Sequence, residues 1–104
     1  VYFNSECEYC QNEAEQISKQ LRVFDKFQVL MISYEPEETI LAFREKYKLI
    51  RPAIAFLQDS KSQFDDIFGR SSIPTSFIYN KNRALVKQFK GEVKTETLIK
   101  YLAQ

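Results

Sequence analysis

The pattern of hydrophobic and polar residues in the first third of the chain predicts a strand, a helix and a second strand. The opening segment Val1-Tyr2-Phe3 is apolar and predicts the end of a buried strand. From about Cys7 to Arg22 the pattern is helical, with one apolar stripe formed by Cys10, Ala14, Ile17 and Leu21. The apolar run from Phe27 to Tyr34 suits a strand that is buried on both faces of a parallel sheet. This order of elements implies a right-handed crossover.

The rest of the chain predicts two more helices, a short apolar segment, a hairpin and a last helix. Pro36 and the acidic residues after it favour a helix start, and Gly69 favours a helix end. A polar link that contains Asn80 and Asn82 is a hairpin signal, and Thr95 is a candidate N-cap. The expected ranges are 36–47 (helix), 53–57 (strand or extended segment), 62–68 (helix), 76–79 and 84–89 (hairpin) and 95–102 (helix).

These elements predict the fold class α/β, with helices on both faces of a central mixed sheet of about four strands. A length of 104 residues suffices for one domain and not for two, so residues 1–104 are expected to form a single domain. The chain starts on an apolar run at Val1, without Met or a signal peptide. We therefore interpret it as a domain excised from a longer precursor.

Composition and charge exclude several classes of function. The formal net charge is +1, so no basic excess indicates a nucleic-acid surface. Apolar runs fall short of the roughly 20 residues of a spanning helix, so a membrane anchor would have to lie in a missing N-terminal segment. The chain has no His, which excludes Ser-His and Cys-His catalytic pairs. With two Cys and no His, no metal site is expected.

The candidate chemistry lies in the motif Cys7-Glu8-Tyr9-Cys10, between the first predicted strand and the first predicted helix. Ser5 is a candidate cap for that helix. Cys7 would lie at the helix N-terminus, where N–H groups and the helix dipole favour the thiolate that attacks disulfides. Cys10, one turn further on, could resolve the resulting mixed disulfide. Glu6 and Glu8 flank Cys7 with negative charge, which disfavours the thiolate and favours a reducing couple.

A second motif supports this interpretation. Ile73-Pro74 directly precedes a predicted strand, where proline is ordinarily disfavoured. An X-Pro bond at such a position is a candidate cis peptide.

Together, these residues resemble the thioredoxin superfamily, and in particular its TlpA/ResA-like branch, the extracytoplasmic thiol-disulfide oxidoreductases of bacteria. The matching segments are residues 1–5, Cys7 to Glu13 (CxxCxxE), residues 73–80 and the long insertion between Tyr34 and Ile73. The sequence departs from the branch at Glu6, Glu15 and Ser72, where Trp, Pro and Gly are often found. These departures concern the fine redox properties more than the fold.

The resemblance implies a thioredoxin-like three-layer α/β/α sandwich and a role for each motif residue. Cys7 would attack, Cys10 would resolve and Glu13 would tune the protonation of the cysteines. Pro74 would shape the substrate groove, and the backbone of Ile73 would pair with an extended substrate segment. Glu8 and Tyr9, between the cysteines, are assigned to the substrate-contacting surface.

The expected function is a thiol-disulfide oxidoreductase that reduces disulfides of extracytoplasmic proteins, in the bacterial periplasm or an equivalent compartment. It needs no organic cofactor and receives electrons from an upstream dithiol partner.

Two alternatives stay open: a peroxiredoxin-like peroxidase, and a binding module whose Cys7–Cys10 disulfide is structural. At the level of single residues, Pro74 could be an ordinary trans proline, and Glu13 could be an exposed helical acid.

Overall fold

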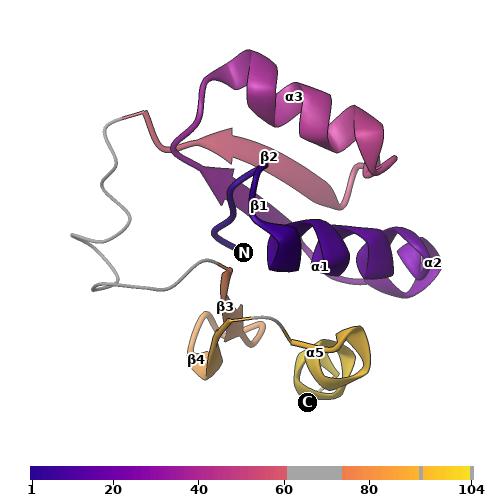
Figure 1. The fold of residues 1–104 in the computed structure, drawn as a ribbon. Coiled ribbons are helices and arrows are strands. Elements are labelled where there is room, and N and C mark those ends of the chain that lie inside the picture. The colour runs from indigo at the N-terminus through magenta and orange to yellow at the C-terminus, as the bar shows by residue number, and fades with distance from the viewer. Residues whose placement is uncertain (61–73, 92, 104) are drawn as a thin grey trace.

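The computed structural model describes residues 1–60, 74–91 and 93–103 (Figure 1). The helices in these ranges are α1 (Glu8–Ser18), α2 (Leu21–Phe24), α3 (Glu37–Lys46) and α5 (Thr95–Leu102). The strands are β1 (Val29–Ser33), β2 (Ile54–Gln58), β3 (Thr75–Tyr79) and β4 (Leu85–Lys90). The helix predicted at 62–68 lies outside the described residues.

The N-terminal segment joins two strand pairs into one mixed sheet. Tyr2 forms a parallel bridge with Ile32 of β1 and an antiparallel bridge with Thr75 of β3. The Tyr2 N–H donates to the Thr75 carbonyl at 2.9 Å, and the Phe3 N–H donates to the Ile32 carbonyl at 2.9 Å. The segment therefore lies in the middle of the sheet, in the order β2, β1, residues 1–3, β3, β4. The predicted buried strand end at Val1–Phe3 is thus confirmed.

The outer strands extend this sheet on both sides. The β1 and β2 strands pair in parallel, with Val29 opposite Ile54 and Ser33 opposite Gln58. The segment predicted at 53–57 as a strand or an extended segment is therefore a strand, β2. The β3 and β4 strands form the predicted antiparallel hairpin, in which the Asn80 side chain accepts hydrogen bonds from the backbone N–H groups of Asn82 and Ala84.

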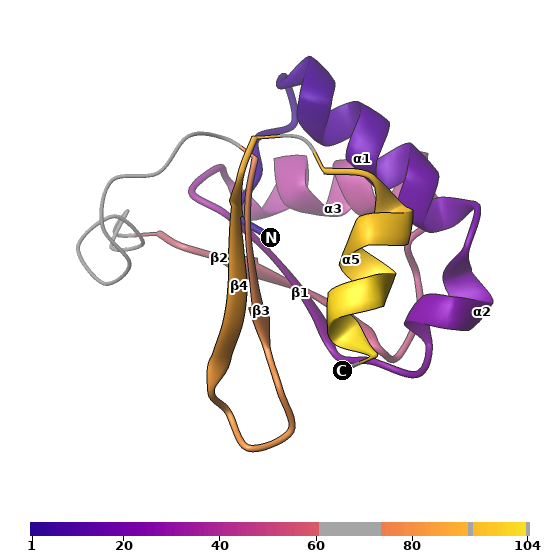
Figure 2. The same cartoon turned by 90° about the horizontal axis from the view of Figure 1, so that it is seen from below.

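Helices cover both faces of the sheet, which confirms the predicted three-layer arrangement. In Figure 1, α3 lies on one side of the β1–β2 pair and α1 on the other. Figure 2 shows α1 and α5 side by side, and these two helices are in contact. The core between the layers is apolar, because Phe3, Phe24, Ile17 and Leu49 are almost completely buried. The Phe3 ring packs on Phe43 of α3, with 4.6 Å between the ring centroids.

Some predicted helix ends are wrong. The helix expected over 7–22 consists of α1 and α2, with a break at Lys19 and Gln20. The Gln20 amide donates to the Thr95 hydroxyl at 2.6 Å, a contact between segments far apart in sequence. The N-cap of α5 is Lys94 rather than Thr95, and the N-cap of α1 is Cys7 rather than Ser5. The Thr95 hydroxyl accepts a hydrogen bond from Gln20, and the Ser5 hydroxyl donates one to Glu35. Because both hydroxyls have other partners, local capping preferences do not decide these two boundaries.

Candidate redox site

Cys7 lies where the central segment of the sheet passes into α1. Three residues, Asn4 to Glu6, make the connection as a tight turn. The Cys7 N–H donates to the Asn4 carbonyl at 3.1 Å, and the Glu6 N–H donates to the Asn4 side-chain oxygen at 2.8 Å. Cys7 itself has an extended backbone conformation, as an N-cap residue requires. The fold thus fixes the first cysteine at the N-terminus of a helix.

The two cysteines contact each other through a backbone hydrogen bond. The Cys10 N–H donates to the sulfur of Cys7 at 3.2 Å. No disulfide joins the two cysteines in this structure. Cys7 is half-buried, whereas Cys10 is only 2 % exposed. An N–H group that points at a sulfur favours negative charge on it, so the geometry suits Cys7 as the attacking thiolate.

The second thiol has the opposite environment. Burial raises the pKa of the Cys10 thiol well above its ordinary range, and its contact with Cys7 and the nearby charge of Glu13 act in the same direction. A hydrogen bond with the Asn4 backbone opposes this shift without cancelling it. Cys10 therefore keeps its proton at neutral pH. The pair combines a partly exposed cysteine, Cys7, and a buried, protonated one, Cys10.

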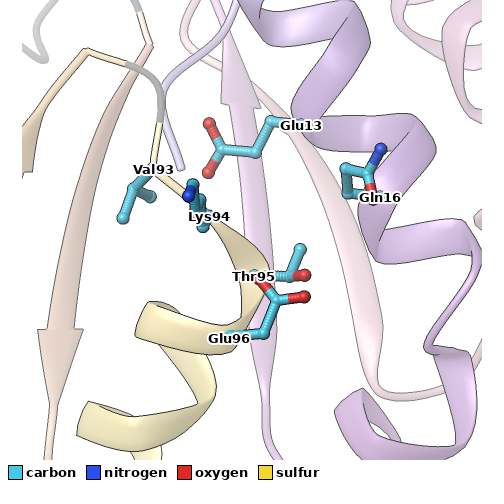
Figure 3. Close-up of a pocket in the computed structure, with 6 residues that line it drawn as sticks. All are labelled: Glu13, Gln16, Val93, Lys94, Thr95 and Glu96. Carbon is cyan, nitrogen blue, oxygen red and sulfur yellow. The ribbon is translucent and has the colours of Figure 1, made fainter.

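Glu13 lies one turn after Cys10 on α1 and is buried, with 3 % of its surface exposed. The alternative that Glu13 is an exposed helical acid is therefore wrong. Its carboxylate accepts a hydrogen bond of 3.4 Å from the hydroxyl of Ser76, which belongs to β3. Figure 3 shows this carboxylate pointing from α1 toward the segment that begins α5.

Glu13 also lines a pocket of about 650 Å³ between α1 and the start of α5 (Figure 3). Three of the other lining residues, Gln16, Lys94 and Glu96, are exposed. The pocket therefore places a polar, solvent-facing region beside the buried acid.

Pro74 lies immediately before β3 and is fully buried. Its carbonyl accepts a hydrogen bond of 2.7 Å from the N–H of Gly91. The neighbouring Thr75 pairs with Tyr2, so the start of β3 lies beside the segment that leads to Cys7. Ile73 lies outside the described residues, and the predicted cis bond between Ile73 and Pro74 stays a prediction.

The two residues between the cysteines face outward. Glu8 is exposed, and 60 % of the Tyr9 surface is exposed. Both residues lie on the first turn of α1, beside Cys7. Their role in contacting substrate stays a prediction, and neither residue belongs to the buried part of the site.

Glu35 is a buried residue near the motif that the sequence pattern did not predict. Only 9 % of Glu35 is exposed, and its carboxylate binds Ser5, two residues before Cys7. A signal was present in the sequence, because Glu35 follows a predicted parallel strand, and the carboxyl ends of such strands commonly carry site residues.

Neither a metal site nor a membrane span is found in the described part of the chain. Residues 1–60, 74–91 and 93–103 contain no cluster of three or more metal-ligating side chains. Over the same ranges, every helix is too short or too polar to cross a bilayer.

Comparison with known proteins identifies the family of this chain. The sequence model of the AhpC/TSA family matches residues 1–88. A comparison with curated proteins gives no match.

Solved structures of bacterial proteins share the fold. StoA from Bacillus subtilis is 23 % identical and superposes with a TM-score of 0.73, over 96 % of this chain and 77 % of StoA. A protein assigned as a thioredoxin from Neisseria meningitidis is 23 % identical, with a TM-score of 0.78 over 95 % of this chain and 67 % of its own. A protein assigned as the thiol:disulfide interchange protein DsbE from Chlorobium tepidum is 22 % identical, with a TM-score of 0.69 over 96 % of this chain and 72 % of its own.

These likenesses confirm the predicted thioredoxin-like fold. The family match agrees with the predicted class of enzyme, a thiol-disulfide oxidoreductase. With the match spanning 88 of its 104 residues, the chain belongs to the AhpC/TSA family.

Proposed function

We propose that the protein reduces disulfide bonds of extracytoplasmic proteins, with Cys7 as the attacking thiol and Cys10 as the resolving thiol. The observation that carries the proposal is the asymmetry of the pair. Cys7 is half-buried at a helix N-terminus and accepts an N–H bond from Cys10, whereas Cys10 is buried. Disulfide exchange by two thiols needs this division into an accessible nucleophile and a shielded second thiol.

The reaction proceeds in two exchange steps. The Cys7 thiolate attacks one sulfur of the substrate disulfide, a Cys7–substrate disulfide forms, and the other substrate sulfur leaves as a thiolate that takes up a proton. Cys10 then loses its proton and attacks the Cys7 sulfur. The Cys7–Cys10 disulfide forms and the second substrate thiol is released, so two electrons have passed to the substrate. An upstream dithiol partner reduces the pair again.

Glu13 is the proposed acceptor of the Cys10 proton. Its buried carboxylate acts electrostatically on Cys10, and the pocket beside it reaches exposed polar residues. A carboxylate in such a place can take a proton from a thiol whose own pKa is high, once the mixed disulfide has formed. The bond from Ser76 helps to hold the carboxylate in place.

The direction of electron flow is proposed from the same environment. Burial raises the pKa of the Cys10 thiol, so the reduced pair gains no stabilisation from a second thiolate, and such stabilisation favours an oxidant. The negative charges of Glu6 and Glu8 beside Cys7 act in the same direction. The pair is therefore assigned to reduction of substrates.

The remaining parts of the proposal rest on the resemblance to the TlpA/ResA-like branch. Substrate would lie against Ile73, Pro74, Glu8 and Tyr9, and the protein would act in the periplasm or an equivalent compartment. Residues 1–104 would work as one domain. The burial of Pro74 and the exposure of Tyr9 agree with these roles.

The test is reduction of insulin disulfides with dithiothreitol as the electron donor. The wild-type protein should accelerate the reaction, and Cys7→Ser should remove the acceleration. A Glu38→Ala variant, which changes an exposed acid on α3, serves as the control and should match the wild type. Full activity in Cys7→Ser contradicts the assignment of roles. Rapid peroxide consumption without insulin reduction would instead identify a peroxidase.

A further inference from the structure

We propose that Glu35 is a positioning residue of the redox site, which holds the turn before Cys7 through Ser5. The inference rests on the proposed function of Cys7. It concerns a carboxylate that takes no part in the exchange steps and that lies 28 residues away in the sequence.

The Glu35 carboxylate binds Ser5 with both of its oxygens. The Ser5 N–H donates to Oε1 at 2.8 Å, and the Ser5 hydroxyl donates to Oε2 at 2.6 Å. Bonds to a carboxylate are stronger than those between neutral groups, and a two-point contact also fixes the orientation of the bound residue. Ser5 is thus held in both position and rotation.

The third polar group of Ser5 is held from the other side. The Gln11 side chain, which belongs to α1, donates to the Ser5 carbonyl at 2.8 Å. Ser5 therefore connects the end of β1 with the first turns of α1. The residue type of Ser5 suggests a helix cap, but its hydroxyl is already bound to Glu35. Ser5 therefore does not cap α1.

Glu35 is itself anchored to the ends of two parallel strands. The Ser33 hydroxyl donates to Oε1 at 2.8 Å and accepts from the Glu35 N–H at 3.1 Å. The Gln58 side chain, at the end of β2, donates to the Glu35 carbonyl at 3.1 Å. A buried carboxylate is costly unless hydrogen bonds compensate for the lost water. The Ser5 N–H, the Ser5 hydroxyl and the Ser33 hydroxyl all donate to this carboxylate and provide the compensation. The carboxylate is therefore part of a rigid support rather than a mobile surface group.

The two-point contact between Glu35 and Ser5, called the clamp from here on, acts on Cys7 through a very short piece of chain. Only Glu6 separates Ser5 from Cys7, and the turn between them is closed by the bond from the Cys7 N–H to Asn4. A shift of Ser5 therefore moves the Cys7 sulfur relative to the Cys10 N–H, which lies at 3.2 Å. Reactivity of a positioned nucleophile is sensitive to displacements on the order of 1 Å.

The experiment measures the rate at which iodoacetamide modifies Cys7 in the reduced protein, over a range of pH. The two main variants are Glu35→Ala, which removes the clamp, and Glu35→Gln, which preserves its shape. The Gln amide oxygen can accept from the Ser5 and Ser33 donors, and its NH₂ group can donate to the Ser5 hydroxyl. Glu38→Ala is the matched control, since Glu38 is an exposed acid on α3.

We expect Glu35→Ala to lower the Cys7 modification rate on the order of tenfold and to change its pH profile. Glu35→Gln should restore most of the rate, and Glu38→Ala should leave it unchanged. A folded Glu35→Ala protein with the rate and pH profile of the wild type overturns the proposal. If Glu35→Ala does not fold, Ser5→Ala removes only one hydroxyl, and an unaltered Cys7 rate in that variant also overturns it.

Modification of Cys7 does not require turnover, so the two proposals fail separately. If the wild type does not reduce insulin but Cys7 modification is slower in Glu35→Ala, the proposed function is rejected and the clamp is retained. Normal insulin reduction in both proteins, together with equal Cys7 rates, rejects the clamp and keeps the function.

Discussion

The backbone N–H of Cys10 donates a hydrogen bond of 3.2 Å to the sulfur of Cys7. This bond exists because Cys7 is the N-cap of α1, where the first N–H groups of the helix lack partners within it. It places a donor at the sulfur that is to carry negative charge and brings the two cysteines into one turn. The division of roles between the thiols follows from this contact together with the burial of Cys10.

Cys10→Ser should trap the reaction halfway. A serine hydroxyl cannot displace the substrate from Cys7, so the mixed disulfide formed in the first step should persist. After incubation with a disulfide-containing protein, non-reducing electrophoresis should show a covalent complex. Dithiothreitol should reduce the mixed disulfide and separate the two proteins. The matched variant Cys7→Ser should form no such complex. A complex that forms through Cys10 in Cys7→Ser would reverse the assigned roles.

The stability of the reduced protein should fall at alkaline pH because of Cys10. Burial raises the pKa of this thiol in the folded state above its ordinary value of 9.0. The unfolded chain therefore releases the proton at lower pH than the folded chain does. The stability contributed by the protonated thiol is complete below the unfolded pKa and is lost as the pH rises from there toward the folded pKa.

Urea unfolding of the reduced protein at about pH 7 and about pH 10 measures this effect. The free energy of unfolding should decrease more between these values in the wild type than in Cys10→Ala, which lacks the titrating group. An equal decrease in both proteins contradicts the assigned environment of Cys10.

Glu13→Gln should slow the second exchange step. The amide cannot accept the Cys10 proton, and positioned acid–base groups commonly contribute a factor on the order of 100. Rapid mixing with a fluorescent mixed-disulfide substrate should show that the first step is retained while release is delayed. Glu15→Gln is the control, because Glu15 is an exposed acid on the same helix. Equal release rates in the two variants would remove Glu13 from the mechanism.

Phe3→Ala should destabilise the protein by about 3–5 kcal/mol. Phe3 is fully buried in the central segment and packs on Phe43, so its removal leaves a cavity between the sheet and α3. Leu85→Ala in β4 is the comparison, since Leu85 is 53 % exposed, and it should cost less than about 1 kcal/mol. Similar losses for the two variants in urea unfolding would contradict the assignment of the core.

Local patterns in the sequence were sufficient for most of the element order within the described residues and for the cysteine pair. The apolar run before Ser33 and the spacing of Cys10, Ala14 and Ile17 depend on neighbouring residues, so they predict β1 and α1 without tertiary information. The helix break at Lys19 and Gln20 was missed. Gln20 binds Thr95, 75 positions later, and such a contact leaves no local signal.

The candidate site shows the same limit. Cys7, Cys10 and Glu13 lie within seven residues, so their shared helix is visible in the sequence. Ser76 reaches Glu13 of that helix, and Glu35 reaches Ser5 before it, only because the chain folds Tyr2 between β1 and β3. No spacing rule connects Ser5 with Glu35, and only the folded sheet brings them together.

The most direct test of the central claim is the equilibrium reduction potential of the Cys7–Cys10 pair, measured against glutathione and dithiothreitol series. We expect a reversible two-electron couple at a reducing potential of about −270 mV, as in thioredoxin. The absence of a reversible couple would contradict disulfide exchange at these cysteines. A potential near about −120 mV would contradict the proposed direction of electron flow.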